Sequence, residues 1–301
     1  MSTLKISDEL VATLIPTEIS GVGMLNGAFE AIIDGLRSSL LRFAEPEGAM
    51  AFHVPPVISR ALLERLGYVD AFPHLLGTLH SFGGDRRRWR EIQAARLADG
   101  TPWHTDQEIS DVVALPATCY HLYPLVAGQA LAQSATLTAE ASCYRHEATS
   151  ELGRLRSFRM REIVRVGSPA DVSAWRDTWL ARARTWFGQL GLTVSVEAAT
   201  DPFFGDAARM MAPPQRQEQL KWELRADLGA GADQAIASAN YHKDHFGSLF
   251  DIRSGTDLAH TACAAFGLER IVLALIAAHG ASLERWPASV RRALTLGVTG
   301  P

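Results

Sequence analysis

The sequence has little cysteine, no long apolar run and no excess of basic charge. Its three cysteines, Cys119, Cys143 and Cys263, include no close pair, which excludes a disulfide framework and leaves free thiols, buried side chains or metal ligands. The longest apolar run, around residues 271–278, is much too short to span a bilayer, and the N-terminus lacks a basic stretch followed by an apolar one. We therefore expect a cytoplasmic protein.

The charge balance and the absent motifs narrow the functions further. The formal net charge of −4 argues against a large nucleic-acid-binding surface, because neutralising phosphates needs a cationic stripe. The local exception is the run Arg86-Arg-Arg-Trp-Arg90, which with Arg96 is typical either of a solvated helix face or of a docking site for an acidic protein. The chain has no Gly-x-Ser-x-Gly elbow and no His-Glu-x-x-His motif, so hydrolase and metalloprotease functions have no support.

Hydrophobic periodicity predicts an α+β fold. Strand-like runs dominate the centre of the chain and helix-like runs flank them, as in an antiparallel sheet with helices on its faces. We assign residues 1–44 to an N-terminal appendage, with a β-prone lead-in and a helix over about 29–43, and residues 45–301 to one domain. Within that domain we predict helices at 56–68, 91–98, 127–133 and 169–190, a partly extended segment at 112–123 and a strand at 192–197.

The most informative segment alternates charged and apolar residues. The runs Cys143-Tyr-Arg-His-Glu147 and Arg154-Leu-Arg-Ser-Phe-Arg-Met-Arg-Glu162 predict two antiparallel strands joined by a mobile loop at 148–153. Such a hairpin suits a nucleotide, because arginine matches phosphate oxygens, an aromatic ring stacks on a purine and a carboxylate accepts from an exocyclic amine. An amphipathic hairpin with solvated charges is the alternative. The residues predicted to share the working face are Cys143, Arg145 and Glu147 in the first strand, and Arg154, Arg156, Phe158, Met160 and Glu162 in the second.

A second segment downstream favours the nucleotide site. In the run Cys263-Ala-Ala-Phe-Gly-Leu-Glu-Arg-Ile-Val-Leu-Ala-Leu-Ile276, Gly267 and Arg270 open a long apolar helix that runs towards Gly280. Together the two segments resemble motifs 2 and 3 of the class II aminoacyl-tRNA synthetases, with the Arg-x-Glu run at 145–147 as the start of motif 2. The resemblance implies the class II catalytic core, an antiparallel sheet flanked by helices.

Three further residues narrow the resemblance. Cys119, Glu162 and Cys263 resemble the zinc ligands of the methanogen-type seryl-tRNA synthetases. The chain most resembles the amino acid:[carrier protein] ligases, stand-alone relatives of that core that load a small amino acid onto a carrier protein. This resemblance implies two steps: ATP converts the amino acid to an aminoacyl-adenylate, and the aminoacyl group then passes to the phosphopantetheine thiol of a holo carrier protein.

The resemblance also implies roles for the residues of the nucleotide site. Arg145 would be the catalytic residue, placed between the amino acid carboxylate and the α-phosphate, where a bidentate guanidinium offsets charge in the transition state. Glu147 would accept from the adenine amino group and Phe158 would stack on the ring. Arg270 would cover the other face of the ring or reach the γ-phosphate, and either Arg154 or Arg156 would hold the pyrophosphate.

At the amino acid end the resemblance implies zinc and a small side chain. Zinc on Cys119, Glu162 and Cys263 keeps an open position for the substrate α-amine, so glycine or alanine is the implied substrate and serine remains an alternative. Ser238 and Asn240 would line the amino acid pocket. Cys143 is expected to be structural, His121 a possible partner of the metal ligands, and His242 with His245 either a metal pair or part of a polar loop.

The sequence departs from the family pattern in three places. Motif 1 is not recognisable, and Ala265 stands where motif 3 usually has its first glycine. Gln234 stands where an acidic residue is expected, which leaves open how magnesium is held with ATP; Asp233 is a possible substitute.

Two other functions stay open. One is a truncated seryl-tRNA synthetase, which would charge tRNA, and the other is a non-catalytic synthetase-like binding protein. The first 44 residues offer no room for a large tRNA-binding domain, which favours a carrier protein over tRNA. By resemblance alone we expect a homodimer.

Overall fold

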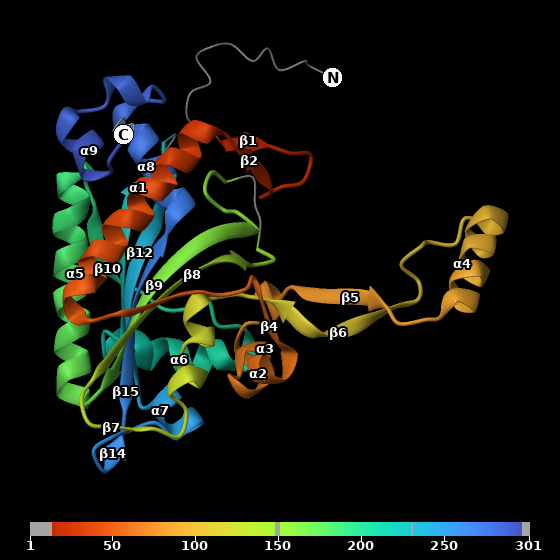
Figure 1. The fold of residues 1–301 in the computed structure, drawn as a ribbon, viewed down its shortest axis with the longest axis horizontal. Coiled ribbons are helices and arrows are strands. Elements are labelled where there is room, and N and C mark those ends of the chain that lie inside the picture. The colour runs from red at the N-terminus through yellow and green to blue at the C-terminus, as the bar shows by residue number, and fades with distance from the viewer. Residues whose placement is uncertain (1–13, 148–150, 230, 297–301) are drawn as a thin grey trace.

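The computed structural model describes residues 14–147, 151–229 and 231–296. Its centre is a seven-stranded sheet within this described part, and all neighbouring strands are antiparallel except β3 and β8 (Figure 1). The predicted α+β class is therefore confirmed. In spatial order the strands are β10 (Ser195–Ala198), β11 (Lys221–Asp227), β12 (Asp233–Lys243), β15 (His260–Gly267), β9 (Ser157–Gly167), β8 (Ala135–Tyr144) and β3 (Met50–His53).

Three helices cover one face of this sheet: α1 (Gly27–Ala44), α5 (Pro169–Gln189) and α8 (Leu268–His279). Their apolar sides bury residues such as Leu36, Trp179 and Ile271 against the strands in one core, which is the main stabilising contribution expected of such a layer. Helix α1 begins where the Asn26 side chain accepts from the Phe29 N–H at 2.9 Å. Helix α1 packs in the main core. The boundary at residue 44, between the N-terminal appendage and the remaining domain, stays a prediction.

The other face of the sheet carries a second core and the smaller elements. These are α2 (Arg60–Arg65), α3 (Tyr68–Ala71), α6 (Gly205–Gln217), α7 (His245–Phe250), the 3-10 helices Thr118–His121 and Tyr123–Val126, and the strands β4 (Val57–Ser59), β7 (Ala130–Leu131), β13 (Arg253–Ser254) and β14 (Asp257–Leu258). A hairpin of β1 (Leu14–Pro16) and β2 (Gly23–Leu25) precedes α1, and the short helix α9 (Ala288–Ala293) follows α8. None of the helices within the described ranges is both long and apolar enough to cross a membrane.

An arm projects from the body. It is a ribbon of β5 (Thr78–Phe82) and β6 (Gln107–Ala114), tipped by helix α4 (Arg86–Asp99), and Figure 1 shows that α4 lies away from the sheet. The helix begins earlier than predicted because the Asp85 side chain accepts from the Arg88 N–H at 2.8 Å. The basic patch is therefore presented at the tip of the arm.

Several local predictions were correct. The helices predicted at 29–43, 91–98 and 169–190 correspond to α1, α4 and α5, and the strand at 192–197 corresponds to β10, which begins at Ser195. The predicted hairpin of antiparallel strands is β8 with β9.

Three local predictions were wrong. The helix at 127–133 is instead the two-residue strand β7, which pairs with β13. The helix at 56–68 is divided into β4, α2 and α3, because the Ser59 side chain caps a new helix at Leu62 N. In the partly extended segment at 112–123 only the start is a strand, because β6 ends at Ala114 and Cys119 lies in a 3-10 helix, where a strand alternation that would put it on one face with His121 does not apply.

The hairpin itself opens earlier than predicted. Strand β8 ends at Tyr144 and β9 begins at Ser157, so Arg145, Glu147, Arg154 and Arg156 lie in the connecting loop, whose residues 148–150 are outside the described part. One further bond crosses the hairpin, from the Arg145 N–H to the Arg156 carbonyl at 2.9 Å, and the next amides then bind distant segments. The His146 N–H donates to the Leu75 carbonyl at 3.0 Å and the Arg156 N–H to the Gly21 carbonyl at 2.7 Å.

Candidate active site

A cavity of about 680 Å³ lies on the second face of the sheet. It gathers residues that are more than a hundred positions apart in the chain. All the predicted site residues except Arg156 line it, namely Cys119, Arg145, Glu147, Arg154, Phe158, Glu162, Ser238, Asn240, Cys263 and Arg270.

Strand register explains how these residues meet. Ser238 is paired with Ala265, and Ala265 with Glu162; Asn240 is paired with Cys263 on the same two strands. Paired residues in an antiparallel sheet point to the same face, so the amino acid and metal candidates form adjacent rows on one surface. The β-sheet thus converts sequence-distant residues into neighbours.

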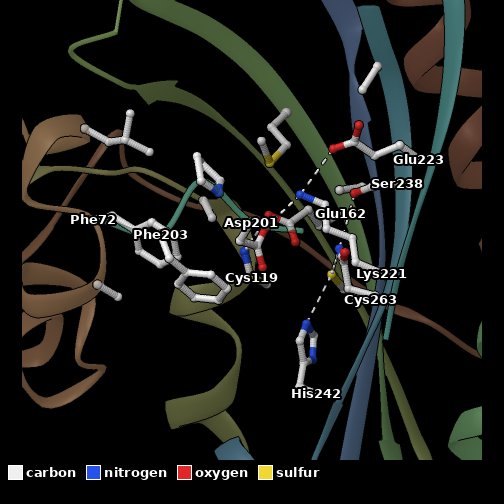
Figure 2. Close-up of a pocket in the computed structure, with 18 of the residues that line it drawn as sticks. Phe72, Cys119, Glu162, Asp201, Phe203, Lys221, Glu223, Ser238, His242 and Cys263 are labelled. Atoms are coloured by element: carbon white, nitrogen blue, oxygen red, sulfur yellow. Dashed lines mark hydrogen bonds and ion pairs between the residues drawn. The ribbon is translucent and has the colours of Figure 1, made fainter. Parts of the chain in front are cut away.

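The two thiols and the carboxylate of the predicted zinc set lie together (Figure 2). Glu162 Oε1 accepts from the Thr118 N–H at 2.8 Å and from the Cys119 N–H at 3.1 Å. Cys263 Sγ accepts from Asn240 Nδ2 at 3.2 Å and lies 3.6 Å from His242 Nε2. The residues therefore form one hydrogen-bonded group at the floor of the cavity.

Mutual contacts shift the ionisation of this group. Burial and the neighbouring Cys263 raise the pKa of Glu162 to about 8. The hydrogen bond from Cys119, with support from His242 and Asn240, holds the pKa of Cys263 below its ordinary value. Within the described residues no set of three or more His, Cys, Asp or Glu side chains is arranged to hold a metal ion, so the zinc site stays a prediction.

The other candidate ligands take different positions. His121 Nε2 lies 3.0 Å from the Val57 carbonyl oxygen, with which it forms a hydrogen bond. Cys143 is fully buried outside the cavity lining, where its sulfur lies 3.5 Å from Thr118 Oγ1. His242 lines the cavity and its Nδ1 lies 3.1 Å from Thr261 Oγ1.

The nucleotide candidates line the same cavity. The Arg145 guanidinium carbon lies 5.5 Å from the centre of the Phe158 ring, and its Nε donates to the Pro116 carbonyl at 3.3 Å. Arg270 donates to the carbonyls of Gly153 and Ala235, both at 2.9 Å. Burial lowers the pKa of Arg270 to about 10, which still leaves it charged at neutral pH.

The structure distinguishes the two loop arginines. Arg154 lines the cavity and lies 3.9 Å from Glu147, whereas Arg156 is outside the lining. Neither candidate for holding magnesium lines the cavity. Gln234 is buried and donates to Glu151 Oε1 at 2.9 Å, and Asp233 pairs with Arg225 at 3.0 Å.

The sequence prediction missed a charged group in the cavity wall. Lys221 Nζ lies 2.7 Å from Asp201 Oδ1 and 3.3 Å from Glu223 Oε1, and Gln215 Nε2 donates to Asp201 Oδ2 at 2.7 Å (Figure 2). Burial alone would raise the pKa of Asp201, but the Lys221 ammonium holds it below its usual range. The alternation of Lys221 and Glu223 along one strand was a signal that could have revealed half of this group. Asp201 lies in an irregular segment and carries no such signal.

Replacing Lys221 with methionine is expected to lower the free energy of unfolding by about 2–3 kcal/mol, because Asp201 loses its paired ammonium group, whereas Glu223 keeps Arg225 at 3.4 Å. The loss is below that of a fully buried pair, since the Asp201 side chain keeps 36% of its exposure. Chemical denaturation measures it. The combined Lys221→Met and Asp201→Asn variant should recover part of the loss; a double variant no more stable than the single one would contradict the pairing.

Comparison with known proteins places the chain in a family. No family model matches it. Amino acid–[acyl-carrier-protein] ligase 1 of Bradyrhizobium diazoefficiens is 41% identical over 282 residues, which cover 92% of this chain and 85% of the relative. The chain belongs to the amino acid–[acyl-carrier-protein] ligase family. Ligase 2 of the same organism is 39% identical over 285 residues, and the family resemblance seen in the sequence is confirmed.

More distant similarities agree with the fold. The type-2 serine–tRNA ligase of Methanothermobacter thermautotrophicus is 23% identical over 265 residues, covering 82% of this chain but 50% of that protein. The crystal structure of A. aeolicus tRNASec in complex with M. kandleri SerRS contains a chain that superposes with a TM-score of 0.80 at 20% identity, over 95% of this chain and 59% of the other. The class II synthetase core predicted for this ligase family member is therefore confirmed.

Proposed function

We propose that the protein uses ATP to activate a small amino acid and transfers the aminoacyl group to the phosphopantetheine thiol of a carrier protein. The observation that carries this proposal is a single cavity lined both by nucleotide-type groups and by amino-acid-type groups. The names of the two Bradyrhizobium relatives, amino acid–[acyl-carrier-protein] ligases, support the same assignment.

The proposed chemistry has two displacements. A carboxylate oxygen of the amino acid bonds to the α-phosphorus of ATP as the bond to the β-phosphate oxygen breaks, releasing pyrophosphate. The carrier thiol, having lost its proton, then bonds to the acyl carbon and AMP leaves. In this proposal Arg145 holds the carboxylate and α-phosphate together, Phe158, whose ring centre is 5.5 Å from the Arg145 guanidinium carbon, stacks on the adenine ring, and Glu147 and Arg154 act from the loop side.

Zinc is proposed on Cys119, Glu162 and Cys263, whose chemistry fits: two thiols, one of them with a lowered pKa, and a carboxylate within one hydrogen-bonded group. When bound, zinc would hold the substrate α-amine in its deprotonated form. Ser238 and Asn240 border this group, and the buried Asn240 Oδ1 has no hydrogen-bond partner among the described residues, which leaves it able to accept from a substrate. Glycine or alanine is the proposed substrate, with magnesium accompanying ATP.

The function is tested by ATP–pyrophosphate exchange on zinc-loaded protein with glycine, alanine and serine, followed by mass spectrometry of a holo carrier protein and of tRNA in the same mixture. We expect exchange with glycine or alanine, and an aminoacyl thioester on the carrier. Charged tRNA would instead support the serine–tRNA ligase alternative, to which the TM-score of 0.80 lends a structural basis. No exchange with any of the three would overturn the proposal in favour of a binding protein.

Helix α4 is proposed as a docking surface for an acidic carrier protein. Arg86 and Arg90 are exposed and form no ion pair within the part of the chain that the structure describes. Reversing both charges, Arg86→Glu with Arg90→Glu, is expected to raise the KM for the carrier about tenfold and to leave pyrophosphate exchange unchanged. Thioester formation against carrier concentration measures the effect.

The matched control reverses two exposed arginines on other helices, Arg184→Glu in α5 and Arg292→Glu in α9. It changes the net charge equally but should leave the KM for the carrier within about twofold. A similar rise in both double variants would show a net-charge effect and contradict docking at α4.

We also propose, by analogy with class II enzymes, that the protein is a homodimer.

A further inference from the structure

A chain of hydrogen-bonded charged residues connects strand β9 and helix α8, two elements that contribute residues to the cavity lining. Arg159 follows Phe158 in β9, and its backbone N–H and Nε donate to Glu269 Oε2 and Oε1 at 2.7 and 2.8 Å. Glu269 precedes Arg270 in the first turn of α8. The same guanidinium donates to both carboxylate oxygens of Glu30 in α1, at 2.6 and 2.8 Å.

Arg159 is shared by two carboxylates in a largely dry environment. The Glu269 side chain is 5% exposed and that of Arg159 is 17% exposed, whereas Glu30 keeps 43%. Removing such charges from water is costly, so a buried ion pair is weak evidence for a gain in stability and is better explained by the position that it imposes. Here the ion pair between Arg159 and Glu269 fixes the position of strand β9 relative to helix α8.

Those segments carry two residues assigned to the nucleotide: Phe158 to one face of the adenine ring, and Arg270 to its other face or to the γ-phosphate. Phe158 and Arg270 both line the cavity, and each is the immediate chain neighbour of a member of the charge chain. Glu269 also lines the cavity, but both of its carboxylate oxygens accept hydrogen bonds from Arg159. Arg159 itself is outside the lining, on the opposite face of β9. The Arg270 side chain is further restrained by its hydrogen bonds to the carbonyls of Gly153 and Ala235. A shift of helix α8 is therefore the main way in which the Arg270 side chain can move relative to Phe158.

We propose that Glu269, held by Arg159 and Glu30, is a positioning residue that sets the spacing between Phe158 and Arg270 and thereby the affinity for the adenine nucleotide. This inference rests on the proposed ATP-dependent function. It assigns helix α1 a second role besides packing, because Glu30 restrains Arg159 from a segment 129 positions away.

The fold contains a matched control for this role. Two turns further along α1, Arg37 Nε donates to Glu140 Oε1 at 2.9 Å, and Arg161 Nη2 donates to Glu140 Oε2 at 2.9 Å. This second network joins the same helix to the same sheet with similar burial, but Arg37, Glu140 and Arg161 are all outside the cavity lining. A purely structural role would make the two networks equivalent.

The test compares Glu269→Gln, Glu30→Gln and Arg37→Gln in the full chain. Calorimetric titration gives the Kd of a non-hydrolysable ATP analogue, and exchange kinetics give kcat and both KM values. For Glu269→Gln we expect about tenfold weaker nucleotide binding and a matching rise in the KM for ATP, because one charge-assisted hydrogen bond is lost. We expect kcat to stay within about threefold and the KM for the amino acid to be unchanged.

The other variants make the result decisive. Glu30 is half-exposed, so the Glu30→Gln variant should fold normally. We expect it to bind the nucleotide about threefold more weakly, and we expect no change in nucleotide binding for Arg37→Gln. Wild-type affinity in both glutamate variants, or equal weakening in Arg37→Gln, would overturn the positioning role. Should Glu269→Gln fail to fold, the comparison of Glu30→Gln with Arg37→Gln decides. A wild-type protein that binds no nucleotide would instead overturn the proposed function itself.

Discussion

Replacing Arg145 with lysine is expected to lower the rate of ATP–pyrophosphate exchange by about 10²–10³-fold, the usual cost of losing one preorganised donor for transition-state charge. Arg145 lines the cavity, and within the described residues its side chain donates through Nε to the Pro116 carbonyl at 3.3 Å. The proposed role uses its two terminal nitrogens to hold the carboxylate and the α-phosphate together. A lysine ammonium keeps the charge but cannot form the planar, bidentate contact.

The measurement is exchange at saturating ATP and amino acid, with thermal unfolding to show that the variant is folded. Arg165→Lys is the matched control, because Arg165 is on the same strand hairpin but pairs with Asp171 on the other face of the sheet. The control should retain exchange within about twofold. A loss of less than tenfold in Arg145→Lys would show that another residue stabilises the reacting phosphate.

Replacing Cys263 with serine is expected to abolish stoichiometric zinc binding and to lower exchange by at least about 10²-fold. Cys263 is the proposed ligand whose pKa is lowered, by contacts with Cys119, His242 and Asn240. A serine hydroxyl is a far weaker ligand at neutral pH. Metal analysis of the purified protein measures binding, and the Kd follows from competition with a zinc-sensitive dye, which does not depend on activity.

Cys143→Ala is the control for the zinc prediction. Cys143 is buried and only 3.5 Å from Thr118, the residue before Cys119, but it lies outside the cavity lining. Its variant should retain one zinc per chain at somewhat reduced stability. Full zinc content in Cys263→Ser, or a wild-type protein that takes up no zinc from a buffered solution and is fully active, would contradict the metal site.

Local sequence patterns determined the family, the fold class and most of the pocket. The alternating run that ends at Glu162 predicted a strand, which is β9, and the Gly267 to Arg270 run predicted the start of helix α8. Capping side chains and apolar periodicity act over a few residues, so they can be recognised without knowing what a segment packs against.

Only the tertiary structure decided where the charged residues of the hairpin loop lie. Alternation placed Arg145 and Arg156 on strands, yet both are in the loop, because their neighbouring amides bind carbonyls of distant segments. The same packing places Arg154 in the cavity and keeps Arg156 out of it. Competition between a strand ladder and long-range partners cannot be recognised from a local pattern.

The Asp201 group and the Glu269 charge chain were also decided by tertiary structure. Asp201 lies in an irregular segment that is held by stacking of Phe203 on Phe72, with ring centres 5.1 Å apart. Glu269 and Glu30 meet Arg159 only because α1, β9 and α8 pack together. The sequence by itself determined which chemical groups are present and which segments form strands or helices; the tertiary structure decided which groups meet, because contacts between distant segments depend on register and packing of the whole core.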